Sequence, residues 1–483
     1  MPLKHYKQAL IFIVFLFLAY FPLFHHLDSH SLRMWDEAIY AVNAFEMSQN
    51  HDFICRHYDG KPILWNPKPP LVTWIQVVSF KVLGYSELSF RLPVALFCLF
   101  TGLSLVWFLR KEFNSISLGY FSAFVLFTAP GYIHFHVART GDPDGVLTFF
   151  VLMYCLIFYK WIEDVSNKKL FYLFAFLVFC AVFTKSFAGL VAMPALLIWA
   201  IYRSKLKEVL SKPFVYIGSF AVVAVVLGYY ILHEFKTPGF IDSVLQKESG
   251  RYSALVQHGE SFWFYLIKMW EGKFLPWIYL IPISFGLIYS EKNKSLKKFI
   301  QFTSLISVSY LIILSLSKTK LIWYIAPMYP FLSILCGYVL FRTLRSLIKI
   351  GNNSLRLGAT AAMILLLMFP YYVILDKVMK RQDNPGERYA YYISKLKEEM
   401  PEFAINTIVI SSLNPHVSFY RQFYNYRDSL DIEINFPRQI EVGDSVISCD
   451  YISIDCLVNK FEVSTLDSYR NCKYLTIDGI RQH

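Results

Sequence analysis

The chain has 483 residues, of which 55% are hydrophobic and 18% aromatic, and its mean hydropathy is +0.41. It is more apolar than a soluble globular protein needs to be to fill its core, so the composition indicates an integral membrane protein. The formal net charge of +12 does not indicate a nucleic-acid partner, because the lysines and arginines fall in short clusters between apolar runs.

Apolar runs long enough to cross a bilayer recur through the first 375 residues. A spanning helix needs roughly 20 apolar residues. The apolar runs of about this length predict about eleven spans. The expected spans are residues 8–27, 91–109, 117–134, 145–161, 170–184, 187–202, 213–232, 273–290, 299–316, 321–341 and 357–375. No small-residue cleavage site follows the first run, so we expect it to be a retained helix.

Positive charges mark one side of these spans. They cluster in alternate connections, at residues 4–7, 110–111, 160–169, 203–212, 292–298 and 342–356. By the positive-inside rule that side faces the cytoplasm. We therefore expect a multi-pass protein of the bacterial inner membrane with a cytoplasmic N-terminus. The loops 28–90 and 233–261 and the tail would then lie on the periplasmic side.

The first external loop, residues 28–90, carries acids and a lysine. Apolar residues recur at helical spacing around Asp36 and Glu37, which predicts an amphipathic helix on the membrane surface. Asp36 would either face a cleft or simply cap this helix. Further on, Lys68 lies in a proline-rich stretch before a second interfacial helix, Leu71 to Leu83. An oriented ammonium beside a membrane suits a phosphate, although a snorkelling lysine is the alternative.

Polar residues expected on the same face follow later in the chain. Asp142 and Asp144 lie in Gly-Asp-Pro-Asp-Gly, a sequence that equally suits a turn and a helix cap. Lys185 interrupts an apolar stretch, and Lys320 and Tyr324 open a later span, where membrane anchoring is the alternative. The convergence of acids and cations on one face favours an acid or base together with a phosphate-binding cluster.

The tail, residues 384–483, is predicted to be a separate small α/β domain. Strands are expected at 407–412, 445–454 and 473–477, and helices at 387–399 and 416–424. Two of Cys449, Cys456 and Cys472 could form a disulfide in an oxidising compartment, and no zinc-binding spacing is present. Cysteines within the spans are expected to be buried hydrophobes: Cys98, Cys155, Cys180 and Cys336.

The order of the short motifs resembles the GT-C glycosyltransferases, over roughly residues 1–375. The match is best to the branch that holds the lipid A aminoarabinose transferases and the protein O-mannosyltransferases (glycosyltransferase family 39-like). The resemblance rests on Trp-Asp-Glu at 35–37, Lys-Pro-Pro-Leu at 68–71, Gly-Tyr-Ser-Glu-Leu-Ser-Phe-Arg-Leu-Pro at 84–93, Ala-Arg-Thr-Gly-Asp-Pro-Asp at 138–144, Thr-Lys-Ser at 184–186 and Ser-Lys-Thr-Lys-Leu-Ile-Trp-Tyr-Ile-Ala-Pro at 317–327. The implied fold is polytopic and α-helical, with a transmembrane domain over 1–375 and a periplasmic α/β domain over 384–483.

This resemblance implies an inverting transfer of sugar from a polyprenyl-phosphate donor to a lipid A, lipopolysaccharide, glycan or protein acceptor. The implied catalytic acids are Asp36, Glu37, Asp142 and Asp144. The implied donor-phosphate ligands are Lys68, Arg251 and Tyr324, with Lys185 and Lys320 as lesser candidates. An inserted Gly141 leaves Asp142 and Asp144 as rival matches. Pro67 makes metal coordination at this motif doubtful, and a divalent metal elsewhere stays open.

A transporter or flippase of lipid-linked sugars is the alternative function. Such proteins place ionisable groups near the membrane midplane and often show repeated halves. Neither feature is clear in this sequence, because Asp36, Lys68 and Asp142 are all expected at one interface. The enzyme is therefore the favoured prediction.

Overall fold

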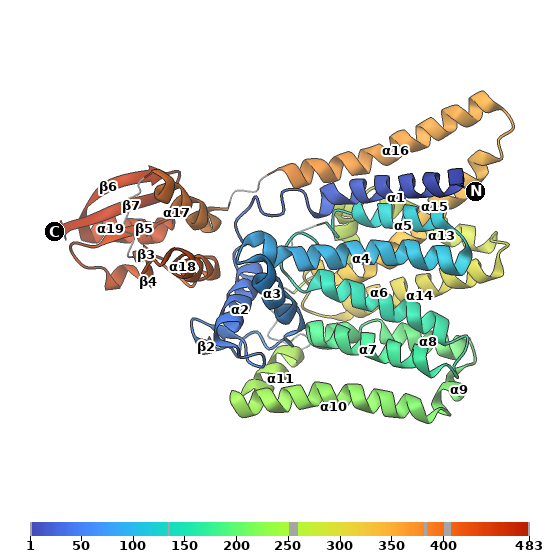
Figure 1. Ribbon diagram of the computed structural model, residues 1–483, viewed down its shortest axis with the longest axis horizontal. Helices are drawn as coiled ribbons and strands as arrows, with labels where there is room; N and C mark the ends of the chain where they lie inside the picture. The colour runs from blue at the N-terminus through green and yellow to red at the C-terminus, as the bar shows by residue number, and fades with distance from the viewer. Residues whose placement is uncertain (1, 134–135, 251–258, 381–383, 400–406, 482–483) are drawn as a thin grey trace. The chain divides into compact units, whose positions relative to one another are not determined.

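The computed structural model describes residues 2–133, 136–250, 259–380, 384–399 and 407–481 (Figure 1). The chain forms two compact units, which are described in turn. The bundle unit contains residues 1–25, 63–75 and 91–379, and the sheet unit contains residues 26–62, 76–90 and 380–483. The predicted boundary between spans and tail coincides with the break after Met379, whereas the loop 28–90 is divided between the units. The two predicted domains stay a prediction.

The bundle unit is almost entirely helical, and Figure 1 shows its long helices running alongside one another. Its elements are α1 (Pro2–Leu23), α5 (Ile116–Phe127), α6 (Asp144–Trp161), α7 (Lys168–Lys185), η1 (Ser186–Leu190), α8 (Met193–Tyr202), α9 (Leu206–Leu210), α10 (Pro213–Lys236), α11 (Phe240–Gly250), α12 (Phe264–Lys268), η2 (Met269–Lys273), η3 (Trp277–Tyr279), α13 (Leu280–Tyr289), α14 (Lys294–Leu316), η4 (Ile322–Met328), α15 (Tyr329–Ile348) and α16 (Asn353–Met379). Two more helices, α3 (Leu71–Leu83) and α4 (Glu87–Phe113), have residues in both units.

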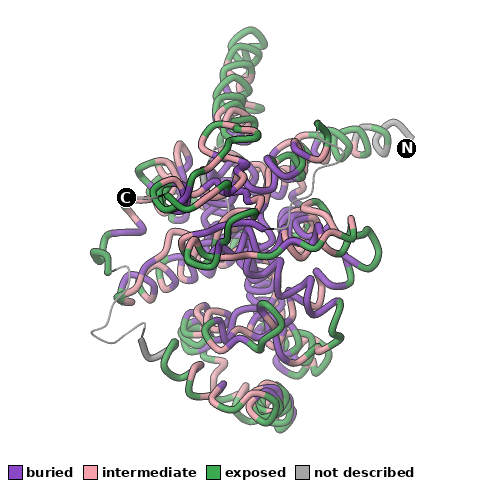
Figure 2. Tube along the Cα trace, turned by 90° about the vertical axis from the view of Figure 1, so that its left-hand side faces the viewer, coloured by how far each residue is buried: buried purple, intermediate pink, exposed green. Residues whose placement is uncertain are grey.

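Among the described residues, seven helical segments are long and apolar enough to cross a membrane. Five apolar helices are shorter, for example Ile116–Phe127 and Met193–Tyr202. The prediction of a polytopic helical membrane protein is thereby confirmed, whereas the count of eleven spans stays a prediction. Only 11% of the most apolar stretch of α10 and of α16 is buried. Green marks such exposed residues in Figure 2, and this exposure suits helices that face lipid.

The predicted span 187–202 is not one continuous helix. The chain turns through η1 after Lys185 and resumes as α8 at Met193. Ser186 adopts a φ of 50°, which interrupts the regular backbone, and Gly189 packs so closely that an added Cβ would lie 2.5 Å from the Ala181 carbonyl carbon. This irregular backbone lies directly beside Lys185.

Close backbone approach holds the bundle together where small residues permit it. A Cβ added to Gly337 of α15 would lie 2.5 Å from Ser122 Oγ of α5. Without a strong hydrophobic driving force between helices in lipid, such contacts supply van der Waals energy. Large buried rings fill the remaining space, among them Trp161, Trp199 and Tyr154.

The sheet unit combines part of the first external loop with the tail. Its elements are α2 (Asp36–Asn50), β1 (His57–Tyr58), β2 (Lys61–Pro62), η5 (Pro385–Glu387), α17 (Arg388–Glu399), β3 (Thr407–Val409), α18 (Pro415–Asp428), β4 (Glu433–Asn435), η6 (Pro437–Gln439), β5 (Ser445–Ser448), α19 (Tyr451–Lys460), β6 (Phe461–Tyr469) and β7 (Cys472–Ile480). Five strands form one mixed sheet in the order β4-β3-β5-β7-β6. β3 is parallel to β4 and β5, whereas β7 is antiparallel to β5 and β6.

The predicted elements of the tail are largely confirmed. Both predicted helices and the three predicted strands have counterparts, but the strand predicted over 445–454 ends at Ser448. The reason is Asp450, whose carboxylate accepts a hydrogen bond from the Ile452 N–H at 3.2 Å and starts α19. Strand β6 was not predicted, because its apolar alternation stops after Phe461 and Val463 and the rest of the strand is mostly polar.

A disulfide joins Cys449 to Cys472, next to β5 and at the start of β7. Both residues are buried, and Cys456 on α19 is an exposed free thiol. Four cysteines within the bundle helices are buried and free, as the sequence predicted: Cys98, Cys155, Cys180 and Cys336.

The first external loop and the tail pack against each other within the sheet unit. Helix α2 contacts α18, and the Tyr58 hydroxyl lies 2.8 Å from Ser418 Oγ. Residues 37–48 of α2 are buried, so this helix has no exposed polar face, contrary to the amphipathic helix that was predicted. The apolar spacing correctly predicts a helix, but contacts with α18, a distant part of the chain, cover the polar side of that helix.

Candidate active site

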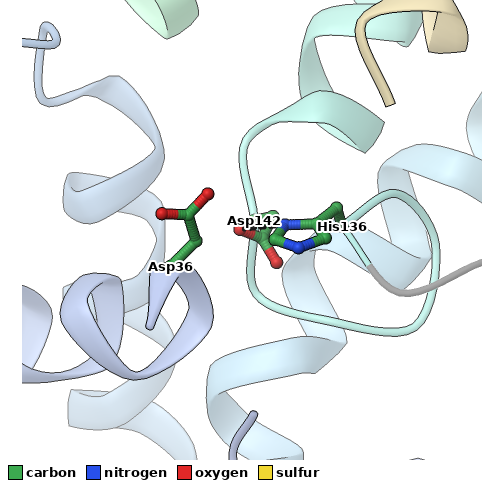
Figure 3. Close-up of side chains that lie close together, drawn as sticks. All are labelled: Asp36, His136 and Asp142. Atoms are coloured by element: carbon green, nitrogen blue, oxygen red, sulfur yellow. Dashed lines mark ion pairs between the residues drawn. The ribbon is translucent and has the colours of Figure 1, made fainter. Parts of the chain in front are cut away.

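Asp142 lies in the loop that leads into α6, and two neighbours in this loop contact it. Thr140 Oγ1 donates a hydrogen bond to Asp142 Oδ2 at 2.6 Å, and His136 Nδ1 lies 3.2 Å from Asp142 Oδ1. Figure 3 shows the His136 ring beside this carboxylate. Burial favours a higher pKa of Asp142, but the charge and hydrogen bond of His136, the Thr140 hydrogen bond and the charge of Lys68 together hold this pKa below its usual value. These neighbours therefore favour the charged form of the Asp142 carboxylate.

The loop is held in shape by contacts that its sequence alone does not reveal. His136 has a φ of 71°, which is uncommon for a residue with a side chain, and its backbone N–H donates to Thr140 Oγ1 at 2.8 Å. Arg139 donates to the carbonyl oxygens of Pro22 and His25 at 3.0 and 2.9 Å. These carbonyls lie at the end of α1, so Arg139 serves as a structural anchor there.

Asp144, the rival of Asp142, is engaged in a buried ion pair. Lys185 Nζ donates to both of its carboxylate oxygens at 2.6 and 2.7 Å, and the two side chains are 4% and 3% exposed. Asp144 is the first residue of α6, where the helix dipole also favours a negative charge. The structure thus separates the two acids: Asp144 neutralises Lys185, whereas Asp142 interacts with His136 and Thr140.

A cavity of about 320 Å³ opens beside this ion pair. Its polar lining consists of Asp144, Lys185, Tyr310, Ser317 and Tyr324. The remaining lining is apolar and comes from α6, α14 and the segment after α7: Leu147, Phe187, Ala188, Val191, Ile313 and Leu314. The cavity therefore has a charged end and hydrophobic walls.

Two consecutive rings of η4 connect these groups. The Trp323 ring stacks on His136 with the ring centroids 3.7 Å apart, and Lys185 Nζ lies 5.1 Å from the centre of the Tyr324 ring. An ammonium at this distance from an aromatic face is attracted to it. The motif at 317–327 thus supplies one ring to the neighbourhood of Asp142 and the next ring to the Asp144–Lys185 pair.

Lys68 lies in the proline-rich segment before α3, and its backbone N–H donates a hydrogen bond to the Asn66 carbonyl oxygen at 2.9 Å. Its side chain is half-buried, and its charge acts on both Asp142 and Asp144. Within the bundle unit the structure therefore brings together five of the predicted residues: Lys68, Asp142, Asp144, Lys185 and Tyr324.

Asp36 and Glu37 lie in the sheet unit, at the start of α2. Trp35, with a φ of 73°, occupies the N-cap position, so Asp36 is not the cap of this helix. Glu37 is buried, and its carboxylate accepts a hydrogen bond from the Arg33 N–H at 2.7 Å. This contact gives Glu37 a structural role at the helix start, and its catalytic role stays a prediction.

The segment before Asp36 is held by Glu387 of the tail. The Glu387 carboxylate lies 3.2 Å from Arg33 Nη1 and accepts a hydrogen bond from the Met34 N–H at 3.2 Å. Its backbone oxygen accepts a hydrogen bond from Ser31 Oγ at 2.9 Å. Burial raises the pKa of Glu387 against the lowering effect of Arg33. These contacts with the tail thus hold residues 31–34, the segment that leads into α2, in place.

Two further predicted residues do not join the site. Lys320 is buried and donates to the carbonyl oxygens of Glu260 and Ser317, so its ammonium supports the turn before η4. Arg251 lies outside the described residues. His136 was not predicted, and the only sequence signal for it is a histidine six residues before Asp142.

Several known proteins are similar to this chain in sequence. Residues 67–231 match the family described as dolichyl-phosphate-mannose-protein mannosyltransferase. An uncharacterized protein of Aquifex aeolicus is 28% identical over 353 residues, which are 72% of this chain and 66% of that protein. The undecaprenyl phosphate-alpha-4-amino-4-deoxy-L-arabinose arabinosyl transferase of Erwinia tasmaniensis is 24% identical over 347 residues. These cover 70% of this chain and 60% of the enzyme, so the matched region is shorter than two thirds of either relative.

Solved structures share the fold. The structure of ArnT from Cupriavidus metallidurans bound to undecaprenyl phosphate superposes with a TM-score of 0.71 at 17% identity, over 96% of this chain and 97% of ArnT. An oligosaccharyltransferase of Archaeoglobus fulgidus, tethered with an acceptor peptide, gives a TM-score of 0.54 at 10% identity, over 89% and 64% of the two chains. The chain is thus a relative of the polyprenyl-phosphate-sugar-dependent GT-C glycosyltransferases of the aminoarabinose transferase and protein O-mannosyltransferase type, as the order of its motifs predicted.

Proposed function

We propose that the protein transfers a sugar from a polyprenyl-phosphate donor to an acceptor of the cell envelope. The observation that carries this proposal is the cavity of about 320 Å³ beside the Asp144–Lys185 pair. A polyprenyl phosphate has an anionic head and an isoprenoid tail, and the cavity has a charged end and apolar walls that match this division. The relationship to ArnT, which was solved with undecaprenyl phosphate, supports the same donor class.

The donor phosphate is assigned to Lys68 and Tyr324, with Lys185 as a third contact. Lysine supplies a point charge, and a tyrosine hydroxyl donates a hydrogen bond to a phosphate oxygen. The leaving group is itself a phosphate, so charge neutralisation serves it better than a strong general acid. Arg251 remains part of this proposal through its position in the sequence alone.

The acids would act on the acceptor. Its hydroxyl attacks the anomeric carbon, the new C–O bond forms as the bond to the phosphate oxygen breaks, and the electron pair leaves with the phosphate. The hydroxyl proton passes to a carboxylate. We assign this proton to Asp36, on the resemblance of its motif, and assign Asp142 as the second acid. Asp142 is favoured over Asp144 because it accepts a hydrogen bond from Thr140 and lies beside His136, whereas both carboxylate oxygens of Asp144 are engaged by Lys185.

A divalent metal stays a prediction. His136 and Asp142 offer an imidazole nitrogen and a carboxylate oxygen 3.2 Å apart, and both are ligand types that such ions use. The ion would polarise an oxygen of the donor or the acceptor. The steps above do not depend on it.

The proposed setting is the outer face of a bacterial inner membrane, with about eleven spans and the tail in the periplasm. This orientation follows from the one-sided lysine and arginine clusters. A periplasmic reporter fused after Asp376 should be active, and the same reporter fused near Lys207 should be silent. The reverse pattern would place the site in the cytoplasm and contradict a donor on the outer leaflet.

The proposed acceptor is a hydroxyl group of an envelope lipid, glycan or protein. Mass spectrometry of these three fractions, with and without the gene, tests the proposal. One fraction should lose a mass equal to a sugar residue when the gene is deleted, and regain it on complementation. A transporter would instead change the distribution of a lipid-linked sugar between leaflets in the complemented strain compared with the deletion strain, and an Asp142→Asn protein would restore that distribution as well as the unchanged protein does.

A further inference from the structure

A second polar cavity lies at the end of the bundle unit away from Asp144. Helix α6 begins at Asp144 and ends at Trp161, so its 18 residues separate the two regions. Helices α8 and α14 contact each other there, and a cavity of about 370 Å³ opens where α8 ends and α14 begins. It is lined by Tyr202, Arg203, Lys294, Ser295, Lys298 and Gln301. Three of these six side chains are cationic.

The positive charge of this cavity exceeds the negative charge beside it. Glu163 lies 2.8 Å from Lys298 Nζ and 3.6 Å from Arg203 Nη2, and it is shared between these two cations. Lys294 forms no ion pair with any other residue that the structure describes, and Arg203 Nε is buried without a hydrogen-bond partner among them. Two cations therefore share one acid, and a third is left for an added anion.

The backbone adds to this field. Lys294 and Lys298 lie on the first two turns of α14, a helix of 23 residues. The positive end of the helix dipole is at this N-terminus, so it adds to the charge of the two lysines. Asn293 caps the helix by accepting hydrogen bonds from the N–H groups of Ser295 and Leu296 at 3.1 Å. The cap fixes the turn from which the two lysines extend. The anion would thus meet side-chain charges on a rigid support.

The surroundings identify the source of the anion. The last turns of α8 expose Leu197, Ile198, Ile201 and Tyr202, at 48–64% exposure, and Tyr202 also lines the cavity. These positions recur at helical spacing on one face of a helix with the composition of a membrane segment. An apolar stripe that leads into a basic cavity suits a molecule with acyl chains and an anionic head.

We propose that this cavity binds the phosphate of an anionic membrane phospholipid, whose acyl chains lie along α8. By the distribution of positive charge, this lipid would belong to the leaflet opposite the one that holds the sugar donor. The inference does not depend on the proposed glycosyl transfer, because none of its residues belongs to the Asp144–Lys185 site.

The test uses the full-length protein, stripped of native lipid in detergent. Its affinities for phosphatidylglycerol, for phosphatidylcholine and for inorganic phosphate are measured by native mass spectrometry and by thermal shift. We expect phosphatidylglycerol to bind and stabilise the protein, and the other two not to. Lys294→Gln and Lys298→Gln should each weaken phosphatidylglycerol binding about fivefold, the effect of one basic residue near an anionic lipid surface.

The matched control is Lys207→Gln on α9, an exposed lysine on the same side that does not line the cavity. It should bind phosphatidylglycerol like the unchanged protein. Lys298→Gln breaks the ion pair with Glu163 and could unfold the protein, whereas Lys294→Gln breaks no ion pair with a described residue. Lys294→Gln therefore still tests the proposal if Lys298→Gln does not fold. Equal affinity in Lys294→Gln, Lys207→Gln and the unchanged protein would overturn the proposal. Binding of inorganic phosphate that is as tight, and as sensitive to Lys294→Gln, would overturn the assignment to a lipid.

Discussion

Lys185 donates hydrogen bonds from one ammonium to both carboxylate oxygens of Asp144, and the pair is almost completely buried. Removal of one partner leaves an uncompensated charge in a dry environment. Such a loss costs about 3–5 kcal/mol, more than the intact pair contributes. The pair therefore fixes the charged end of the cavity, and each member depends on the other.

This mutual dependence predicts non-additive stability. Asp144→Asn and Lys185→Met should each lower the thermal midpoint of the detergent-solubilised protein by several degrees. The double variant should lose less than the sum of the two, because no unpaired charge remains. Thermal unfolding of the four proteins measures this coupling. Losses that simply add would mean that the two residues do not act as a pair.

Tyr324 and Lys68 should contribute to donor binding without supporting the fold. Tyr324→Phe keeps the ring beside Lys185 but removes the hydroxyl, and Lys68→Ala removes a charge. We expect each to weaken binding of a short-chain polyprenyl phosphate by about 1.5–3 kcal/mol, the range for hydrogen bonds to charged groups. Binding in detergent is the measurement. Tyr289→Phe, which changes a tyrosine that is 85% exposed at the end of α13, is the control.

Glu387 should influence activity through the segment that precedes Asp36. Glu387→Gln weakens the contact with Arg33 and leaves the fold of the sheet intact, so we expect faster amide hydrogen exchange at residues 31–36 and reduced sugar transfer. Glu399→Gln, which changes an exposed acid on α17, should alter neither. Unchanged exchange at 31–36 in Glu387→Gln would contradict a positioning role for Glu387.

The disulfide makes a separate prediction about the tail. Cys449 and Cys472 are 23 residues apart in sequence, and a loop of this size corresponds to about 2–4 kcal/mol of stabilisation. Thiol labelling of the native, unreduced protein should modify Cys456 and spare the bonded pair. A reducing agent should expose two further thiols and lower the thermal midpoint. Two free thiols at 449 and 472 in protein from intact cells would contradict a tail in an oxidising compartment.

Much of the bundle could be predicted from the sequence, because apolar runs and positive clusters act locally. Long-range contacts were not visible. The helix at Asp36 was predicted, but its burial depends on α18, which lies more than 360 residues later in the chain. The break between α7 and α8 depends likewise on Ser186 and on the packing of Gly189 against Ala181, which a hydropathy pattern does not report.

The candidate site shows the same limit. The motifs identified Asp142, Asp144, Lys185 and Tyr324, but they could not assign the two acids to different partners. That assignment rests on side-chain contacts across α6, α7 and the loop before α6. His136 was missed because its role depends on a left-handed backbone and on stacking against Trp323, neither of which leaves a spacing signal.

Sugar transfer by an Asp142→Asn protein tests the central claim most directly. Membranes from cells that lack the gene supply donor and acceptor, purified protein is added, and the released polyprenyl phosphate and the modified acceptor are quantified by mass spectrometry. The account predicts that Asp142→Asn sharply lowers both products, because the second acid of the site loses its negative charge. Its thermal midpoint should stay close to that of the unchanged protein. Asp164→Asn, which changes an exposed acid beyond the far end of α6, should be fully active. Full transfer by Asp142→Asn would contradict the claim.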